Sequence, residues 1–164
     1  MGEMTNKATE ARAINYMFPT VSTEIYRGYT GEYNAKLHDG IDILPLTPGE
    51  PGDQVYAFAN GTVALSGYTS SRGNYVVLNH GLINGLYLRT IYLHLQKAPT
   101  LKQGQTVSMG DVVGYMGNTG DSYGEHLHFS IRYKTGAQGA FTVGGQYFEG
   151  VSTNPKNYFS WIDK

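Results

Sequence analysis

The residues of this chain best suited to chemistry are its histidines, two of which form the run His126-Leu127-His128. Successive side chains alternate between the two faces of a strand, so His126 and His128 would point the same way, about 6.6 Å apart. Leu127 and the hydrophobic residues that alternate after it would then face the core. One imidazole can bind a metal while the other stands just outside the coordination shell. The full set of histidines is His38, His80, His94, His126 and His128.

The segment His38-Asp39-Gly40-Ile41-Asp42 adds a histidine and a carboxylate to the same chemistry. In an extended chain His38 and Asp42 would lie about 13 Å apart, too far to share one ion. Gly40 permits a bend between them, so we place His38 in a loop and Asp42 near the start of a strand. Two histidines, one carboxylate and a water form an open catalytic zinc site. Asp39 is an alternative ligand, but we interpret it as a turn residue before Gly40.

Composition restricts the classes of protein that this chain can be. It contains no cysteine, which excludes disulfides, thiolate catalysis and cysteine-bound zinc. Its net charge of −1 argues against a nucleic-acid-binding protein that works through a basic surface. No apolar run approaches the roughly 18 residues of a membrane span, and residues 1–17 lack the apolar core of a signal peptide. Spacing alone leaves hydrogen-bonded histidines as the alternative to a metal site.

The histidines and Asp42 must be positioned by the short segments rich in Val, Ile, Leu and Tyr, which glycine and proline separate. Their spacing predicts an all-β sandwich or barrel, and no segment of about 10–12 residues shows a helical period. Residues 1–17 are interpreted as a tail and 18–164 as a single domain. Residues 134–153 suggest a hairpin, and His80 is expected to be structural, near a strand end. The predicted strands cover residues 41–44, 54–59, 61–67, 74–79, 86–95, 111–116 and 126–133.

Several motifs follow one another along most of the chain, from about Phe18 to Tyr158. Residues 38–42 fit the pattern H-x-G-x-D, and residues 119–129 fit TG-x-s-x-G-x-H-L-H-F. In order and spacing, these motifs resemble those of the M23 peptidases, the lysostaphin- and LytM-type zinc endopeptidases that cut peptidoglycan crosslinks. Further segments that match the family are residues 55–63, 73–81, 92–95, 104–107 and 110–114, and Asn154-Pro155 with Tyr158.

The resemblance implies a fold and a set of functional residues. The fold would be a LytM/lysostaphin-type sandwich of antiparallel sheets, with long loops around a groove. One zinc ion per chain would be bound by His38, Asp42 and His128, while His94 and His126 would be catalytic residues that do not bind it. We expect His126 to be the general base and His94 to orient it or to stabilise the oxyanion, although the two roles can be exchanged.

Three further residues are candidates for substrate binding. Some family members place before the first ligand a tyrosine that stabilises the transition state, and both Tyr29 and Tyr33 are available for this role. Asn74 is a third candidate, within the motif that begins at residue 73. Glu125 stands where the family commonly has proline or a small residue, so it adds a carboxylate near the catalytic edge. We expect the loops 68–73 and 137–148 to form the walls of the groove.

The resemblance implies a zinc-dependent endopeptidase that hydrolyses stem or cross-bridge peptides of peptidoglycan, outside the cell or in the wall, or as a phage-borne lysin. The resemblance does not decide whether the bond that is cut is a Gly–Gly, a D-Ala–Gly or a D-Ala–diaminopimelate crosslink. The net charge is compatible with a monomer. A non-catalytic peptidoglycan-binding or amidase-activator-like protein of the same fold is the alternative, although it would lack a ligand. Carrier modules with an attachment lysine and iron oxygenases leave the histidine pattern unexplained.

Overall fold

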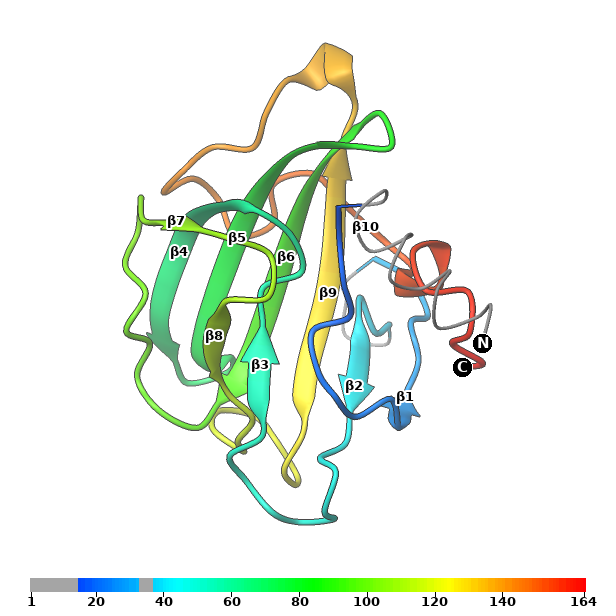
Figure 1. Cartoon of the computed structure of the whole chain (residues 1–164), viewed down its shortest axis with the longest axis vertical. Helices are drawn as coiled ribbons and strands as arrows, with labels where there is room; N and C mark the ends of the chain where they lie inside the picture. The colour runs from blue at the N-terminus through cyan, green and yellow to red at the C-terminus, as the bar shows by residue number, and fades with distance from the viewer. Residues whose placement is uncertain (1–14, 33–36) are drawn as a thin grey trace.

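The computed structural model describes residues 15–32 and 37–164, and within them the chain forms two antiparallel β-sheets (Figure 1). The large sheet has the order β1-β2-β9-β6-β5-β4-β7, and β10 also pairs with β9. The small sheet consists of β3 and β8. The strands are β1 Ile25–Arg27, β2 Ile41–Ile43, β3 Gln54–Tyr56, β4 Gly61–Thr69, β5 Gly73–Ile83, β6 Leu86–Leu95, β7 Thr106–Val107, β8 Val112–Tyr115, β9 Leu127–Lys134 and β10 Val151–Thr153.

The all-β prediction is confirmed, since the only helical elements in the described ranges are two short 3₁₀ helices. These are η1, Gly136–Gln138, and η2, Pro155–Asn157. Neither the expected hairpin over residues 134–153 nor a strand end at His80 is found. The segment contains η1 and β10, which pairs with β9. β5 continues past His80 because a bulge near Gly81 lets it resume pairing with β6 at Leu82.

The hydrophobic core lies between the small sheet and one face of the large sheet. Leu127, Phe129 and Ile131 of β9 point into it and are fully buried, as the alternation along this strand predicts. The small sheet contributes Val55 and Val113 to the same core. The opposite face of β9 therefore carries His128 and the residues that alternate with it.

The packed part of the chain begins before residue 18. Tyr16, which the sequence analysis assigned to the tail, is only 8% exposed and stacks on Phe58 with 5.1 Å between ring centroids. Residues 1–14 lie outside the described residues. No helix of the described part of the chain has the length and apolar character needed to cross a bilayer.

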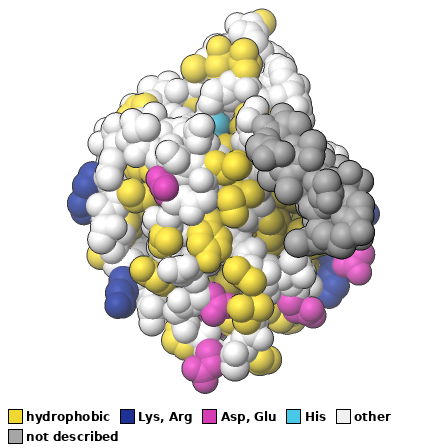
Figure 2. All heavy atoms as spheres, in the orientation of Figure 1, with side chains coloured by type: hydrophobic (Ala, Val, Ile, Leu, Met, Phe, Trp, Pro, Cys, Tyr) yellow, Lys and Arg dark blue, Asp and Glu magenta, His cyan; other side chains and the backbone are white. Residues whose placement is uncertain are grey.

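The face of the molecule on which β3 and β8 lie is poor in histidine. Figure 2 shows this face, where hydrophobic side chains form an uneven patch among uncharged polar atoms. His128 belongs to the other face of the large sheet, because its neighbours Leu127 and Phe129 point into the core. The candidate site must therefore be sought on the side of the large sheet away from the small one.

Candidate metal centre and active site

The pairing of β2 with β9 brings the two metal motifs together. Asp42 stands directly opposite His128 in the antiparallel register, and the bend at Gly40 returns His38 to the same place. A Cβ atom at Gly40 would collide with the carbonyl oxygen of Phe129. Only glycine therefore allows the bend to lie against β9, which explains physically why this motif needs a glycine between His38 and Asp42.

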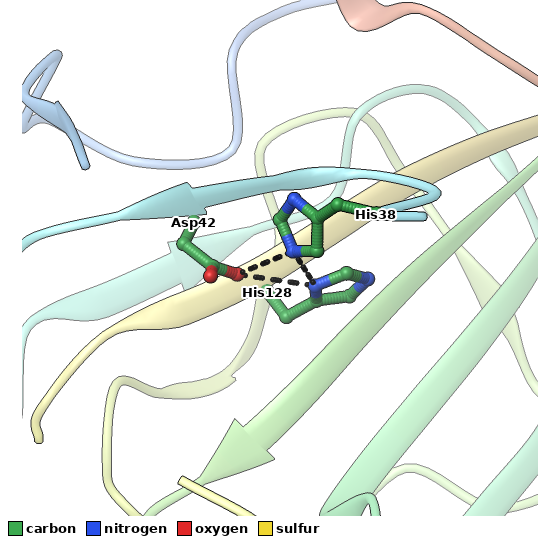
Figure 3. Close-up of side chains that lie close together, drawn as sticks. All are labelled: His38, Asp42 and His128. Atoms are coloured by element: carbon green, nitrogen blue, oxygen red, sulfur yellow. Dashed lines mark hydrogen bonds and ion pairs between the residues drawn. The ribbon is translucent and has the colours of Figure 1, made fainter. Parts of the chain in front are cut away.

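Three side-chain atoms converge from these elements, as Figure 3 shows. His38 Nε2 lies 3.1 Å from His128 Nδ1 and 3.2 Å from Asp42 Oδ1, and His128 Nδ1 lies 3.1 Å from Asp42 Oδ1. All three residues are buried. In a tetrahedral zinc site with bonds of about 2.0–2.1 Å, ligand atoms lie about 3.3 Å apart. The three candidate atoms thus already have the spacing that zinc requires, and their chemistry suits it.

Both imidazoles of this group are oriented by hydrogen bonds on their far nitrogen atoms. His38 Nδ1 donates to the carbonyl oxygen of Gly28 at 2.9 Å. His128 Nε2 lies 3.2 Å from Asp39 Oδ1, and both of these residues are buried. A histidine that binds a metal usually donates its second N–H to such a partner, which fixes the tautomer and the ring. Asp39 therefore does more than form the turn assigned to it from the sequence.

Charges at this centre shift the pKa values of its residues strongly. Burial alone would raise the pKa of Asp42, but hydrogen bonds from His128 and His38 and their positive charge hold it well below its usual range. Burial alone would lower the pKa of His128, but Asp39 and Asp42 outweigh it and raise the pKa to about 9. Without a metal, His128 is thus a cation between two carboxylates, and a metal must displace its proton.

His94 and His126 lie beside the three converging residues, with 4.9 Å between their ring centroids. His126 Nδ1 donates to the carbonyl oxygen of Gly124 at 2.8 Å, and His94 Nδ1 donates to that of Thr119 at 2.7 Å. A carbonyl oxygen can only accept, so Nε2 of each neutral ring carries a lone pair. His126 Nε2 lies 3.6 Å from Asp42 Oδ1, next to the candidate metal position.

The environment of His94 sets it apart from His126. Burial is the main cause that lowers the pKa of His94, to about 4. Its backbone has a φ of +63°, in the left-handed region that residues other than glycine rarely adopt. The backbone N–H of His94 donates to the carbonyl oxygen of Arg72 at 2.9 Å. His94 is therefore held in a strained conformation as a neutral ring, an arrangement typical of functional sites.

A cavity of about 560 Å³ opens over these five residues. Both loops expected as its walls contribute to it, with Arg72 from one and Tyr147 and Phe148 from the other. The segment 121–125, which was not among the expected walls, closes another side and includes Tyr123 and Glu125. The converging group is therefore open toward a space large enough for a peptide.

Comparison with known proteins agrees with this geometry. The family model described as "Peptidase family M23" matches residues 36–140, which include all five of the residues around the candidate centre. The chain belongs to peptidase family M23. The family resemblance inferred from the motifs is thereby confirmed.

The peptidoglycan DD-endopeptidase ShyA of Vibrio cholerae is 40% identical over 95 residues, which cover 57% of this chain and 20% of that protein. A crystal structure of a zinc-containing peptidase from Vibrio cholerae matches with a TM-score of 0.59 and 31% identity, over 71% of this chain and 36% of the other. Lysostaphin from Staphylococcus simulans matches with a TM-score of 0.60 and 26% identity, over 91% of this chain and 51% of the lysostaphin chain. The chain thus spans about half or less of each of these three relatives, and it has the LytM/lysostaphin-type fold.

Two of the three candidates for substrate binding, Tyr29 and Asn74, do not line the cavity. The Tyr29 hydroxyl lies 3.0 Å from Ser152 Oγ and does not line the cavity. The Asn74 side-chain amide donates to the carbonyl oxygen of Leu95 at 3.2 Å, and this residue borders a separate depression. Tyr33 lies outside the described residues. Tyr147, which belongs to a loop expected as a wall, and Asp39, which was interpreted as a turn residue, do line the cavity. For Asp39, its place inside the H-x-G-x-D motif was the available signal.

Proposed function

We propose that this chain is a zinc-dependent endopeptidase that hydrolyses peptide crosslinks of bacterial peptidoglycan. The observation that carries the proposal is the convergence of His38, Asp42 and His128, with 3.1–3.2 Å between their ligand atoms, beneath a cavity that also holds His94 and His126. The similarity to ShyA, a peptidoglycan DD-endopeptidase, supports peptidoglycan as the substrate. A wall substrate in turn supports action outside the cytoplasm.

In this proposal zinc would be bound by His38 Nε2, Asp42 Oδ1 and His128 Nδ1. When bound, zinc supplies a Lewis acid for the scissile carbonyl group and lowers the pKa of a bound water toward 7. The donor set supports zinc, since it combines two imidazoles with one carboxylate and leaves one side open toward the cavity. Gly28 and Asp39 keep the two imidazoles in the orientations that this role needs.

His126 is assigned as the general base. Its Nε2 lone pair faces the centre because Nδ1 donates to Gly124, and the carboxylate of Asp42 nearby stabilises the cation that forms when His126 takes a proton. His126 then passes this proton to the departing amine, which is a poor leaving group as an anion. Burial opposes protonation of His94, so this residue is assigned to accept a hydrogen bond and orient the attacking water. A neutral His94 with its proton on Nδ1 offers the oxyanion no donor.

The test is mass spectrometry of muropeptides released from purified peptidoglycans of several crosslink types. Each digestion compares the zinc-loaded protein with His126→Ala, after the zinc content of both has been measured. Crosslinked dimers should fall to monomers only with the unaltered protein, and fragment masses then name the bond that is cut. If one equivalent of zinc is bound and no wall type is cut, the endopeptidase proposal fails, and a non-catalytic wall-binding protein becomes the better account.

A further inference from the structure

Arg72 occupies a position of its own in the wall of the cavity. It lies in the turn between β4 and β5, where its backbone N–H donates to Thr69 Oγ1 at 3.0 Å. Its carbonyl oxygen accepts the backbone N–H of His94 at 2.9 Å. The main chain of Arg72 is therefore fixed directly to one of the two proposed catalytic histidines, and its side chain lines the same cavity.

The guanidinium of Arg72 is placed by aromatic rings. Its central carbon lies 3.5 Å from the centroid of Tyr147 and 5.4 Å from that of Tyr75. A planar guanidinium stacks on such a ring face, and this stack keeps the edge of the fork free for hydrogen bonds. The side chain is half-buried, so it keeps access to the cavity.

The segment that carries Tyr147 is itself held firmly. Arg89 and Arg132, on the same face of the large sheet, are buried and donate to backbone carbonyl oxygens of six residues between 142 and 150. Arg132 also forms two hydrogen bonds with the carboxylate of Glu32, at 2.9 and 3.2 Å. The ring beneath Arg72 is therefore prepositioned, which lowers the entropy cost of binding a ligand there.

Arg72 differs from these two arginines in having no ionic partner within residues 15–32 and 37–164. Among the described residues, no carboxylate lies within 4 Å of its guanidinium, and its side chain donates no hydrogen bond. Asp39 and Asp42, the buried carboxylates of the cavity, are already engaged by histidines. Arg27 also lines the cavity but is exposed. Arg72 thus offers a prepositioned fork of donors, next to His94, that nothing in the described chain uses.

We propose that Arg72 binds a carboxylate of the substrate beside the scissile bond. The preferred crosslink would then carry a free carboxylate on the carbon next to the scissile nitrogen, as D-Ala–diaminopimelate does. A glycine bridge has no such group at this position. The inference rests on the proposed function and narrows its substrate class. An arginine pairs with a carboxylate through two parallel hydrogen bonds, and a hydrogen bond between charged groups is worth roughly 10- to 100-fold in affinity.

The experiment uses two synthetic crosslinked peptides that differ only at this carboxyl group, which is free in one and a carboxamide in the other. The zinc-loaded protein should cleave the free acid with a kcat/KM about tenfold higher, the lower end of the range because Arg72 is only half-buried. Arg72→Gln should reduce this ratio nearly to one, and Arg72→Lys should restore part of it. Lys97→Gln makes the same change of charge at an exposed residue outside the cavity and should keep the ratio.

Two results would overturn the assignment of Arg72. One is equal cleavage of both peptides by the unaltered protein, and the other is a ratio that survives Arg72→Gln. Binding of both peptides to zinc-loaded His126→Ala, with and without Arg72→Gln, gives a readout that does not depend on cleavage. If neither peptide is cut, the proposed function fails for this crosslink. The Arg72 assignment then stands only if the free acid binds about tenfold more tightly and Arg72→Gln abolishes that difference.

Discussion

Acid should destabilise this fold through His80, the histidine that does not line the cavity. A directed chain of hydrogen bonds surrounds it. The N–H of Phe58 donates to the Tyr92 hydroxyl at 2.9 Å, which leaves this hydroxyl to donate to Thr90 Oγ1 at 2.8 Å. Thr90 in turn donates to His80 Nε2 at 2.8 Å, and His80 Nδ1 donates to the carbonyl oxygen of Asn60 at 2.8 Å. Every member is satisfied only while His80 is neutral.

Burial lowers the pKa of His80 from 6.5 to about 4, although its hydrogen bond to Asn60 opposes the shift. Below pH 6.5 the unfolded chain binds a proton at this residue that the folded chain does not, so stability falls as the pH drops toward 4. Between pH 7.5 and 4.5 the loss from this residue is about 2.5 kcal/mol. Other groups titrate over the same range, so the contribution of His80 must be isolated by comparison with a variant.

The contribution of His80 is isolated by urea unfolding of the unaltered protein and of His80→Gln, each at pH 7.5 and at pH 4.5. Gln does not titrate, so other groups contribute equally to both proteins, and the unaltered protein should lose about 2 to 3 kcal/mol more than the variant. Thermal unfolding at the same two pH values provides an independent check. A difference below about 0.5 kcal/mol, which is within the error of such extrapolations, would refute the argument that the hydrogen-bond chain requires neutral His80.

Three further substitutions test the candidate centre itself. Asp39→Asn keeps the shape of the side chain but removes the charge that orients His128, so affinity for zinc, measured by chelator competition, should fall about 10- to 100-fold; unchanged affinity would contradict this role. His126→Ala should lower kcat about 10²- to 10⁴-fold in a peptide-cleavage assay while the zinc content stays at one equivalent, and loss of zinc would instead make His126 a ligand. Gly40→Ala should reduce both zinc content and melting temperature because its Cβ would collide with the Phe129 carbonyl oxygen; a variant with normal zinc content would show that β2 can shift without cost.

Local patterns were sufficient to predict much of the candidate centre. The alternation in β9 sends Leu127 and Phe129 into the core and His128 to the other face, and this depends only on the geometry of a strand. The bend between His38 and Asp42 was predicted from the requirement that both side chains would have to reach one ion, and the structure has this bend. These predictions succeeded because each depends on residues that are near one another in sequence.

The features that were missed depend on contacts between distant segments. Asp39 reaches His128 only because β2 pairs with β9 in one particular register, which nothing in residues 38–42 specifies. Tyr29 turns to Ser152 because β10 shares an edge of β9 with β2, whereas residues 134–153 had suggested a hairpin of their own and gave no sign that β10 would pair with β9. β5 extends past His80 through a bulge. The neighbouring Gly81 had instead suggested that the strand ends there.

Arg89 and Arg132 contact the segment 142–150 mainly through its main-chain oxygen atoms. The path of this wall is therefore held largely by two side chains that belong to the sheet, and the wall's own Glu149 adds hydrogen bonds with Lys134 and with the backbone N–H of Thr142. Val143 and Phe148 are about half exposed and can vary without removing those contacts. Side chains on the open side of this wall can therefore change, by evolution or by grafting, while the course of its main chain stays the same.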